Sequence, residues 1–150
     1  MTNVITILLV EDNPDHAFLA KESIKKAKLN NNVIVVEDGQ EALDYLYRIG
    51  KFGDTNEYPL PDLILLDIKL PKKDGIEVLT DIKSNDDLKD IPVVMLTSST
   101  RDEDIMQSYH NGANSYLTKP VSFTEFTEKM RDLQHYWCIT NTMPPKKNNV

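Results

Sequence analysis

Short apolar runs alternate with amphipathic segments along this chain of 150 residues. Five of the runs are four to six residues long and rich in aliphatic or β-branched side chains, a pattern typical of strands buried in a parallel sheet. They cover residues 5–10, 33–36, 63–66, 93–96 and 115–118. The pattern therefore predicts five strands.

A segment with apolar side chains at helical spacing follows each predicted strand. The stripes are Ala17, Ala20, Ile24 and Ala27; Ala42, Tyr45, Leu46 and Ile49; Ile76, Leu79 and Ile82; Ile105 and Tyr109; and Phe123, Phe126, Met130, Leu133 and Trp137. Helix starts are indicated by Pro14 and by three residue pairs with capping-box spacing: Asp38 with Glu41, Thr100 with Glu103, and Ser122 with Glu125. Strands that alternate with helices predict an α/β fold with a doubly wound parallel sheet. Residues 50–61 lack this periodicity and predict a long loop.

Composition places the chain among globular proteins, since 40% of it is hydrophobic and 27% is charged. The single cysteine, Cys138, excludes an internal disulfide, and three scattered histidines make a zinc site improbable. The sequence contains neither an apolar run of about 20 residues nor a secretory signal pattern. We therefore expect a cytoplasmic protein that does not enter the membrane.

Charge further narrows the classes of partner. Lysine and arginine total 17 against 24 aspartate and glutamate residues, which gives a formal net charge of −7. Such a surface is repelled by phosphate backbones, and no basic helix offsets the repulsion. We expect no direct binding to nucleic acid.

Five polar side chains stand at the carboxyl ends of predicted strands, the edge at which open parallel sheets bind ligands. Glu11 and Asp12 follow the first strand, Asp67 the third, Thr97 the fourth and Lys119 the fifth. Three clustered carboxylates repel one another by about 4 kcal/mol per close pair at an intermediate dielectric. A hard divalent cation, above all Mg²⁺, relieves that repulsion.

The other two side chains indicate what such a cation would help to bind. The Lys119 ammonium and the Thr97 hydroxyl suit phosphoryl oxygens, and Asp67 facing a phosphoryl group could form an aspartyl phosphate. Taken singly, each residue has a simpler interpretation as a helix cap, a strand-end hydroxyl or a surface charge. Their coincidence at four strand ends favours the functional interpretation.

These residues lie in segments that resemble the response-regulator receiver domains of two-component signalling. The resemblance rests on residues 8–13, 62–67, 70–75, 95–98 and 116–120, which read LLVEDN, DLILLD, LPKKDG, MLTS and YLTKP. It implies a flavodoxin-like strand order 2-1-3-4-5, a receiver domain over residues 3–137 and an irregular tail over residues 138–150.

The resemblance also implies a role for each site residue. Asp67 would be the phosphoacceptor, and Mg²⁺, which Mn²⁺ could replace, would be held by Glu11, Asp12, Asp67 and the backbone carbonyl of Lys69. Thr97 and Lys119 would bind the phosphoryl group, Thr97 and Tyr116 would form the conformational switch, and a cis peptide before Pro120 would direct Lys119 into the site.

A closer resemblance is to the single-domain regulators paired with phytochromes. It rests on the loop over residues 50–61, the run DIKLP over residues 67–71 and a final helix that reaches Tyr136 and Trp137. It implies a histidine kinase as partner, with a phytochrome-like photoreceptor kinase as one candidate. Because Tyr136 and Trp137 extend beyond the expected edge of the sheet, we also expect a homodimer through the last helix and tail.

Two other functions fit parts of the pattern. A Mg²⁺-dependent phosphohydrolase could use Asp67 as nucleophile, but enzymes of the haloacid-dehalogenase kind place a second aspartate two residues later, where this chain has Lys69. A receiver-like binding module that never accepts phosphate usually lacks one of the five site residues, all of which are present here. The leading hypothesis is therefore a phosphoacceptor signalling protein, not an enzyme acting on other molecules.

Overall fold

Five parallel strands form one sheet in the order β2-β1-β3-β4-β5. The structure is a computed structural model that describes residues 4–26, 31–119 and 128. The strands are β1 (Ile5–Val10), β2 (Asn31–Val36), β3 (Leu63–Leu66), β4 (Val93–Thr97) and β5 (Ser115–Thr118). The helices are α1 (Pro14–Lys26), α2 (Gly39–Leu46), α3 (Gly75–Ser84), α4 (Asp102–His110) and the short 3₁₀ helix η1 (Gly50–Gly53). The predicted doubly wound α/β fold and its strand order are confirmed.

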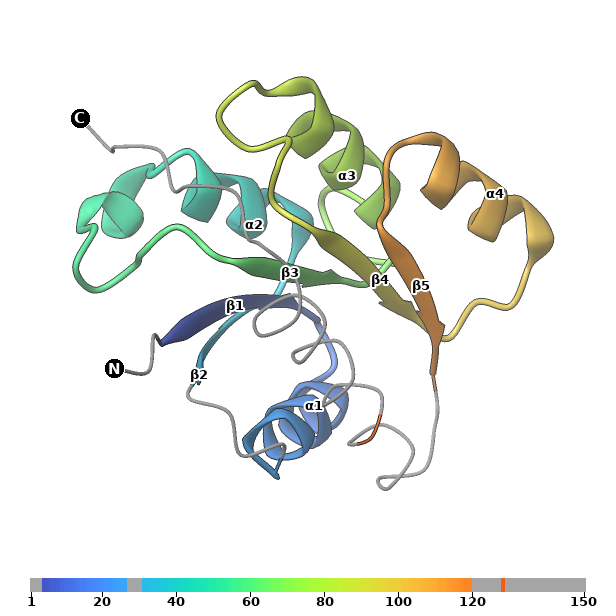
Figure 1. Ribbon diagram of the computed structural model, residues 1–150, viewed down its shortest axis with the longest axis horizontal. Helices are drawn as coiled ribbons and strands as arrows, with labels where there is room; N and C mark the ends of the chain where they lie inside the picture. Colours follow the sequence, from blue (N-terminus) through green and yellow to red (C-terminus); the bar gives the residue numbers. More distant parts are fainter. Residues whose placement is uncertain (1–3, 27–30, 120–127, 129–150) are drawn as a thin grey trace.

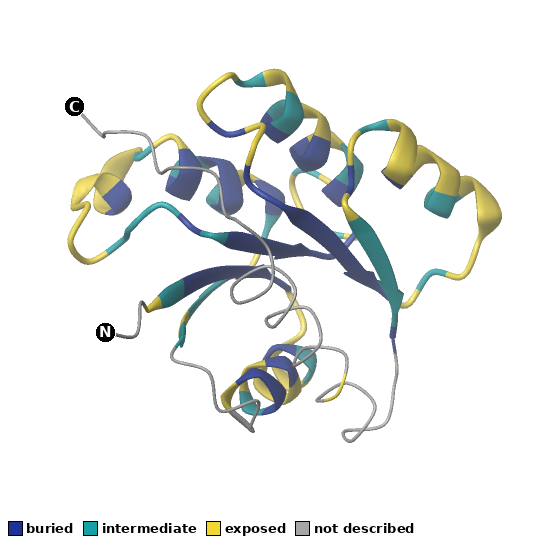
Figure 2. Ribbon diagram, viewed as in Figure 1, coloured by how far each residue is buried: buried dark blue, intermediate teal, exposed yellow. Residues whose placement is uncertain are grey.

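The sheet separates two apolar cores because alternate residues of a strand point to opposite faces. In β1, Ile7 and Leu9 join the core beneath α1, whereas Leu8 and Val10 join the core on the other face. Figure 1 shows α1 on one side of the sheet and α2, α3 and α4 on the other. The strands β1, β3 and β4 are buried almost throughout, while the helices expose their outer faces (Figure 2).

The strand register brings distant parts of the chain together at one edge. Val10 pairs with Leu66, so the residues that follow β1 and β3 emerge side by side. The backbone N–H of Asp67 donates to the Val10 carbonyl at 3.2 Å, and the N–H of Lys119 donates to the Thr97 carbonyl at 2.6 Å. Backbone pairing alone therefore gathers the polar strand ends that the sequence analysis singled out.

Two details of the predicted helices are wrong. The stripe of the second helix does not reach Ile49, because α2 ends at Leu46 and Arg48 adopts a left-handed backbone with φ of 59°, which leaves Ile49 exposed. Thr100 does not cap α4: the helix begins after Arg101, and the side chain of Arg101 makes no capping hydrogen bond. Asp38, by contrast, caps α2 as predicted by accepting from the Glu41 N–H at 2.7 Å.

The predicted loop over residues 50–61 is more ordered than its sequence suggests. It contains η1, and the rings of Tyr45, Phe52 and Tyr58 contact one another with centroids 5.0–5.8 Å apart. The hydroxyl of Tyr45 donates to the Pro59 carbonyl at 2.5 Å, and burial raises the pKa of this phenol to about 12. The aromatic cluster anchors the loop against α2.

Several expectations concern residues outside the described part of the chain. They are the cis peptide at Pro120, the final helix through Tyr136 and Trp137, and the tail over residues 138–150. Among the residues that the structure does describe, none of the helices has the length and apolar character needed to cross a membrane.

Candidate phosphoacceptor site

Three carboxylates meet at the carboxyl edge of the sheet. Glu11 and Asp12 follow β1, Asp67 follows β3, and one oxygen of each lies within 4.8 Å of the others. Glu11 and Asp67 are only 3% and 7% exposed, whereas Asp12 is exposed to solvent. The structure thus assembles the predicted acidic cluster, with two of its charges removed from water.

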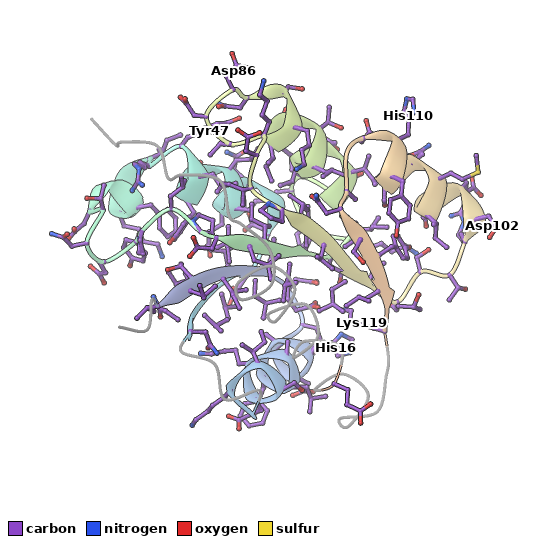
Figure 3. The ribbon with its side chains drawn as sticks, viewed as in Figure 1. His16, Tyr47, Asp86, Asp102, His110 and Lys119 are labelled. Atoms are coloured by element: carbon purple, nitrogen blue, oxygen red, sulfur yellow. The ribbon has the colours of Figure 1, made fainter. Side chains whose placement is uncertain are left out.

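Among the described residues, one buried cation faces this cluster. Lys119, 8% exposed, donates from Nζ to Glu11 Oε1 and, at 3.1 Å, to Asp67 Oδ2. Its third contact is His16 Nδ1 at 3.2 Å, which accepts because an ammonium can only donate. Figure 3 shows His16, on the first turn of α1, beside Lys119 at the end of β5. The two buried carboxylates and one ammonium leave a local charge of −1, to which Asp12 adds another negative charge.

The charge and the hydrogen bonding of the cluster both fit a hard divalent cation. Asp67 Oδ1 is buried and has no hydrogen-bond partner, although an unsatisfied buried acceptor costs about 1–3 kcal/mol. The cluster offers oxygen donors and excess negative charge, the ligand chemistry that Mg²⁺, Ca²⁺ and Mn²⁺ prefer. A cation held by Glu11, Asp12 and Asp67 would satisfy both requirements.

The turn that follows Asp67 is held tightly against the start of α3. Gly75 donates its N–H to the Ile68 carbonyl at 2.6 Å, and a Cβ on Gly75 would lie 2.0 Å from the Asp67 carbonyl oxygen. Asp74 caps α3 by accepting from the Glu77 N–H at 3.0 Å. This close approach of α3 to the backbone of Asp67 and Ile68 requires glycine at position 75. Lys69, within the same turn, is exposed.

Thr97, at the end of β4, and Tyr116, in β5, are both hydrogen-bonded to the backbone of Ser99. Thr97 is 1% exposed, and its hydroxyl oxygen accepts from the Ser99 N–H at 3.4 Å. The hydroxyl of Tyr116 donates to the Ser99 carbonyl at 2.9 Å. Burial raises the pKa of the Tyr116 phenol. The structure therefore brings together the two residues predicted to form the switch.

Sequence reasoning missed two residues of this region, His16 and Ser99. His16 reaches the site because Asn13 caps α1, accepting from the N–H groups of Asp15 and His16 at 2.9 and 3.2 Å, and so turns the first helical turn toward Lys119. An asparagine just before Pro14 was the available signal. Ser99 lies in a loop, where no periodicity marks it.

A doubly wound sheet with an acidic cluster, a buried lysine and a strand-end threonine at its carboxyl edge defines a class of phosphoacceptor proteins. Residues 7–131 match the family of the response regulator receiver domain. The chain therefore belongs to the response regulator receiver family and is a phosphoacceptor signalling protein of the two-component type.

Individual relatives agree with this assignment over nearly the whole chain. The chain is 43% identical over 138 residues to the regulatory protein FilR2 of Methanothrix harundinacea. That alignment covers 92% of this chain and 86% of FilR2. It is 41% identical over 138 residues to the response regulator Rcp1 of Synechocystis sp., covering 92% of each.

Solved structures show the same similarity. The phosphorylated cyanobacterial phytochrome response regulator RcpA superposes with a TM-score of 0.86 at 39% identity, covering 95% of this chain and 100% of RcpA. The Mn²⁺-bound form of Rcp1 superposes with a TM-score of 0.82 at 40% identity, covering 94% of this chain and 99% of Rcp1.

Proposed function

We propose that Asp67 accepts a phosphoryl group from a partner histidine kinase in a Mg²⁺-dependent reaction. The observation that supports this most directly is the state of the Asp67 carboxylate. It is buried at the end of the central strand, one oxygen is bound by Lys119, and the other has no partner within a cluster of three carboxylates. No other aspartate among the described residues combines these features.

The chemistry follows from the positions of the side chains. An Asp67 oxygen attacks the phosphorus of a phosphohistidine, the P–N bond breaks, and its electron pair stays on the donor imidazole. Lys119 and Thr97 bind the phosphoryl oxygens, and Lys119 exchanges its bond to Asp67 for one to the phosphoryl group. Mg²⁺ would be held by Glu11, Asp12, Asp67 and the Lys69 carbonyl. Its positive charge would stabilise the negative charge on the oxygens of the transferred group.

The response to phosphorylation involves Thr97 and Tyr116. When the Thr97 hydroxyl turns toward the phosphoryl group, it leaves space that the ring of Tyr116 can fill while the Tyr116 hydroxyl stays bound to the Ser99 carbonyl. The altered surface of α4 and β5 then signals by docking or dimerisation.

The comparisons support a particular kind of partner. Two phytochrome-related regulators, Rcp1 and RcpA, align with this chain along almost their full length, which favours a phytochrome-like kinase as phosphodonor. We propose a cytoplasmic location, where such a kinase obtains ATP, and no direct nucleic-acid binding, because the net charge is −7. Homodimerisation through Tyr136 and Trp137 remains part of the proposal, as does a receiver domain over residues 3–137.

The test is phosphorylation of the purified chain by acetyl phosphate and, separately, by a phosphorylated histidine kinase. We expect one phosphoryl group per chain by intact mass, present with Mg²⁺, absent with excess EDTA, and removed by hydroxylamine, as for an acyl phosphate. Failure of both donors to transfer a phosphoryl group in the presence of Mg²⁺ would refute the proposed function.

Mg²⁺ should also stabilise the folded chain, because the acidic cluster exists only in the native state. At ten times its dissociation constant the gain in the free energy of unfolding is about 1.4 kcal/mol, or a rise of very roughly 3–6 °C in Tm. Asp12→Ala should abolish this rise, measured by differential scanning fluorimetry. Asp15→Ala is the matched control, since Asp15 is an exposed aspartate nearby that does not belong to the cluster. An undiminished Mg²⁺ response in Asp12→Ala would contradict the metal site.

A further inference from the structure

Ser99 is hydrogen-bonded to Thr97 of the phosphoacceptor site, to Asp104 of α4 and to Tyr116 of β5. Its N–H donates to Thr97 Oγ1 at 3.4 Å, and its carbonyl accepts from the Tyr116 hydroxyl at 2.9 Å. Its own hydroxyl donates to Asp104 Oδ2 at 2.5 Å and accepts from the Arg101 N–H at 3.3 Å. Every polar group of this one residue is therefore bound, each to a different residue.

The bond to Asp104 matters because α4 has no conventional cap. Arg101, at the N-cap position, makes no side-chain hydrogen bond to the helix. Asp104 lies in the first turn, and its backbone carbonyl also accepts from the Ser108 hydroxyl one turn later, at 2.8 Å. Among the described hydrogen bonds, the Ser99 hydroxyl thus provides the side-chain link between the loop that leaves Thr97 and the start of α4.

The contact of Ser99 with Thr97 is much longer than its contact with Asp104. At 3.4 Å it lies at the weak end of N–H···O geometry, whereas the Asp104 bond is short and involves an ionised acceptor. If Thr97 turns toward a phosphoryl group on Asp67, its weak bond to the Ser99 N–H changes first. The strong bond to Asp104 transmits the resulting movement of Ser99 to α4. The Ser99 carbonyl stays bound to Tyr116.

We propose that Ser99 is a positioning residue that couples phosphorylation of Asp67 to α4 through the hydrogen bond of its hydroxyl to Asp104. This inference rests on the proposed function, because it requires a phosphoryl group on Asp67. Ser99 itself is not needed for the transfer, because its hydroxyl is hydrogen-bonded to Asp104 and Arg101 and to none of the described site residues Lys119, Glu11, Asp12 and Asp67. Variants that lack the Ser99 hydroxyl should therefore take up the phosphoryl group normally but lose most of the conformational response of α4.

The experiment compares Ser99→Ala and Asp104→Ala with conservative variants that retain the bond. Ser99→Thr keeps a hydroxyl donor, and Asp104→Asn keeps an oxygen acceptor. Ser98→Ala, at the exposed neighbouring position, is the matched control. For each protein we would measure phosphoryl uptake from acetyl phosphate by mass spectrometry, and the NMR shifts of the Tyr116 ring and the amides of residues 102–110 before and after phosphorylation.

We expect every variant to take up phosphate as the wild type does. Ser99→Ala and Asp104→Ala should show a much smaller shift change in the amides of residues 102–110, since loss of a hydrogen bond to a charged group moves a two-state equilibrium by about tenfold. The Tyr116 ring should still respond, because its hydroxyl is bound by the Ser99 backbone carbonyl, which these variants retain. Ser99→Thr and Ser98→Ala should respond as the wild type does, and Asp104→Asn, whose amide oxygen accepts without a charge, should fall between Asp104→Ala and the wild type. If Ser99 had only a structural role, Ser99→Ala would lower the melting temperature or reduce phosphoryl uptake. It would not lose the NMR response of α4 while uptake stayed normal.

Two outcomes overturn the inference and identify the failing step. A full shift change in Ser99→Ala and Asp104→Ala, with normal uptake, would overturn the role of Ser99 alone. No uptake by the wild type, from acetyl phosphate or from a phosphorylated histidine kinase, would overturn the proposed function and this inference with it.

Discussion

Phosphoryl uptake should disappear when Asp67 is replaced by asparagine. The amide of Asp67→Asn has almost the shape of the carboxylate but is not a nucleophile toward phosphorus. Neighbouring Glu11 should not substitute for it, because Glu11 Oε1 is bound to Lys119 and Oε2 accepts from the Asn13 N–H at 3.1 Å. Intact mass after incubation with acetyl phosphate and Mg²⁺ should therefore show the unmodified chain only.

Asp62→Asn provides the matched control for this experiment. Asp62 precedes the same strand at its opposite end, and its Oδ2 accepts from the Thr6 N–H at 2.9 Å, a bond that an asparagine oxygen can also accept. This variant should keep wild-type uptake. Stoichiometric labelling of Asp67→Asn, or equal loss of labelling in both variants, would refute the assignment of Asp67.

The central strands could be predicted from the sequence because a strand buried on both faces needs a continuous apolar run. Residues 63–66 meet this condition, and β3 occupies the predicted bounds. The loop after α2 could not be predicted in the same way. Its order depends on contacts among the rings of Tyr45, Phe52 and Tyr58. The fold brings these rings together, and no local periodicity of the sequence indicates it.

The same distinction applies to the site. Glu11, Asp67 and Lys119 could be placed together because the carboxyl ends of parallel strands share one edge, whatever the details of the side chains. His16 and Ser99 could not, because each reaches its partners through the geometry of a loop or a first helical turn. Strand-end residues were therefore predictable, and the residues that orient them required the structure.

Lys119→Met should produce the largest loss of stability of any single change at the site. The substitution keeps most of the side-chain volume but removes the cation that lies against the buried carboxylates of Glu11 and Asp67. Breaking a buried ion pair by removing one partner costs about 3–5 kcal/mol, because the remaining charge is left uncompensated. Urea unfolding without divalent cations should show this decrease in the free energy of unfolding.

Comparison with other variants shows whether charge is the cause. Lys89→Met, which removes an exposed ion pair with Asp86, should change stability by less than about 1 kcal/mol. Adding Asp67→Asn to Lys119→Met should restore part of the lost stability, since one of the two opposed carboxylates becomes neutral. Mg²⁺ should likewise stabilise Lys119→Met more than the wild type, because Mg²⁺ then neutralises the carboxylate charge that Lys119 neutralises in the wild type. If Lys119→Met unfolds at the wild-type urea concentration, the buried ammonium does not balance the cluster, and the electrostatic argument for the site fails.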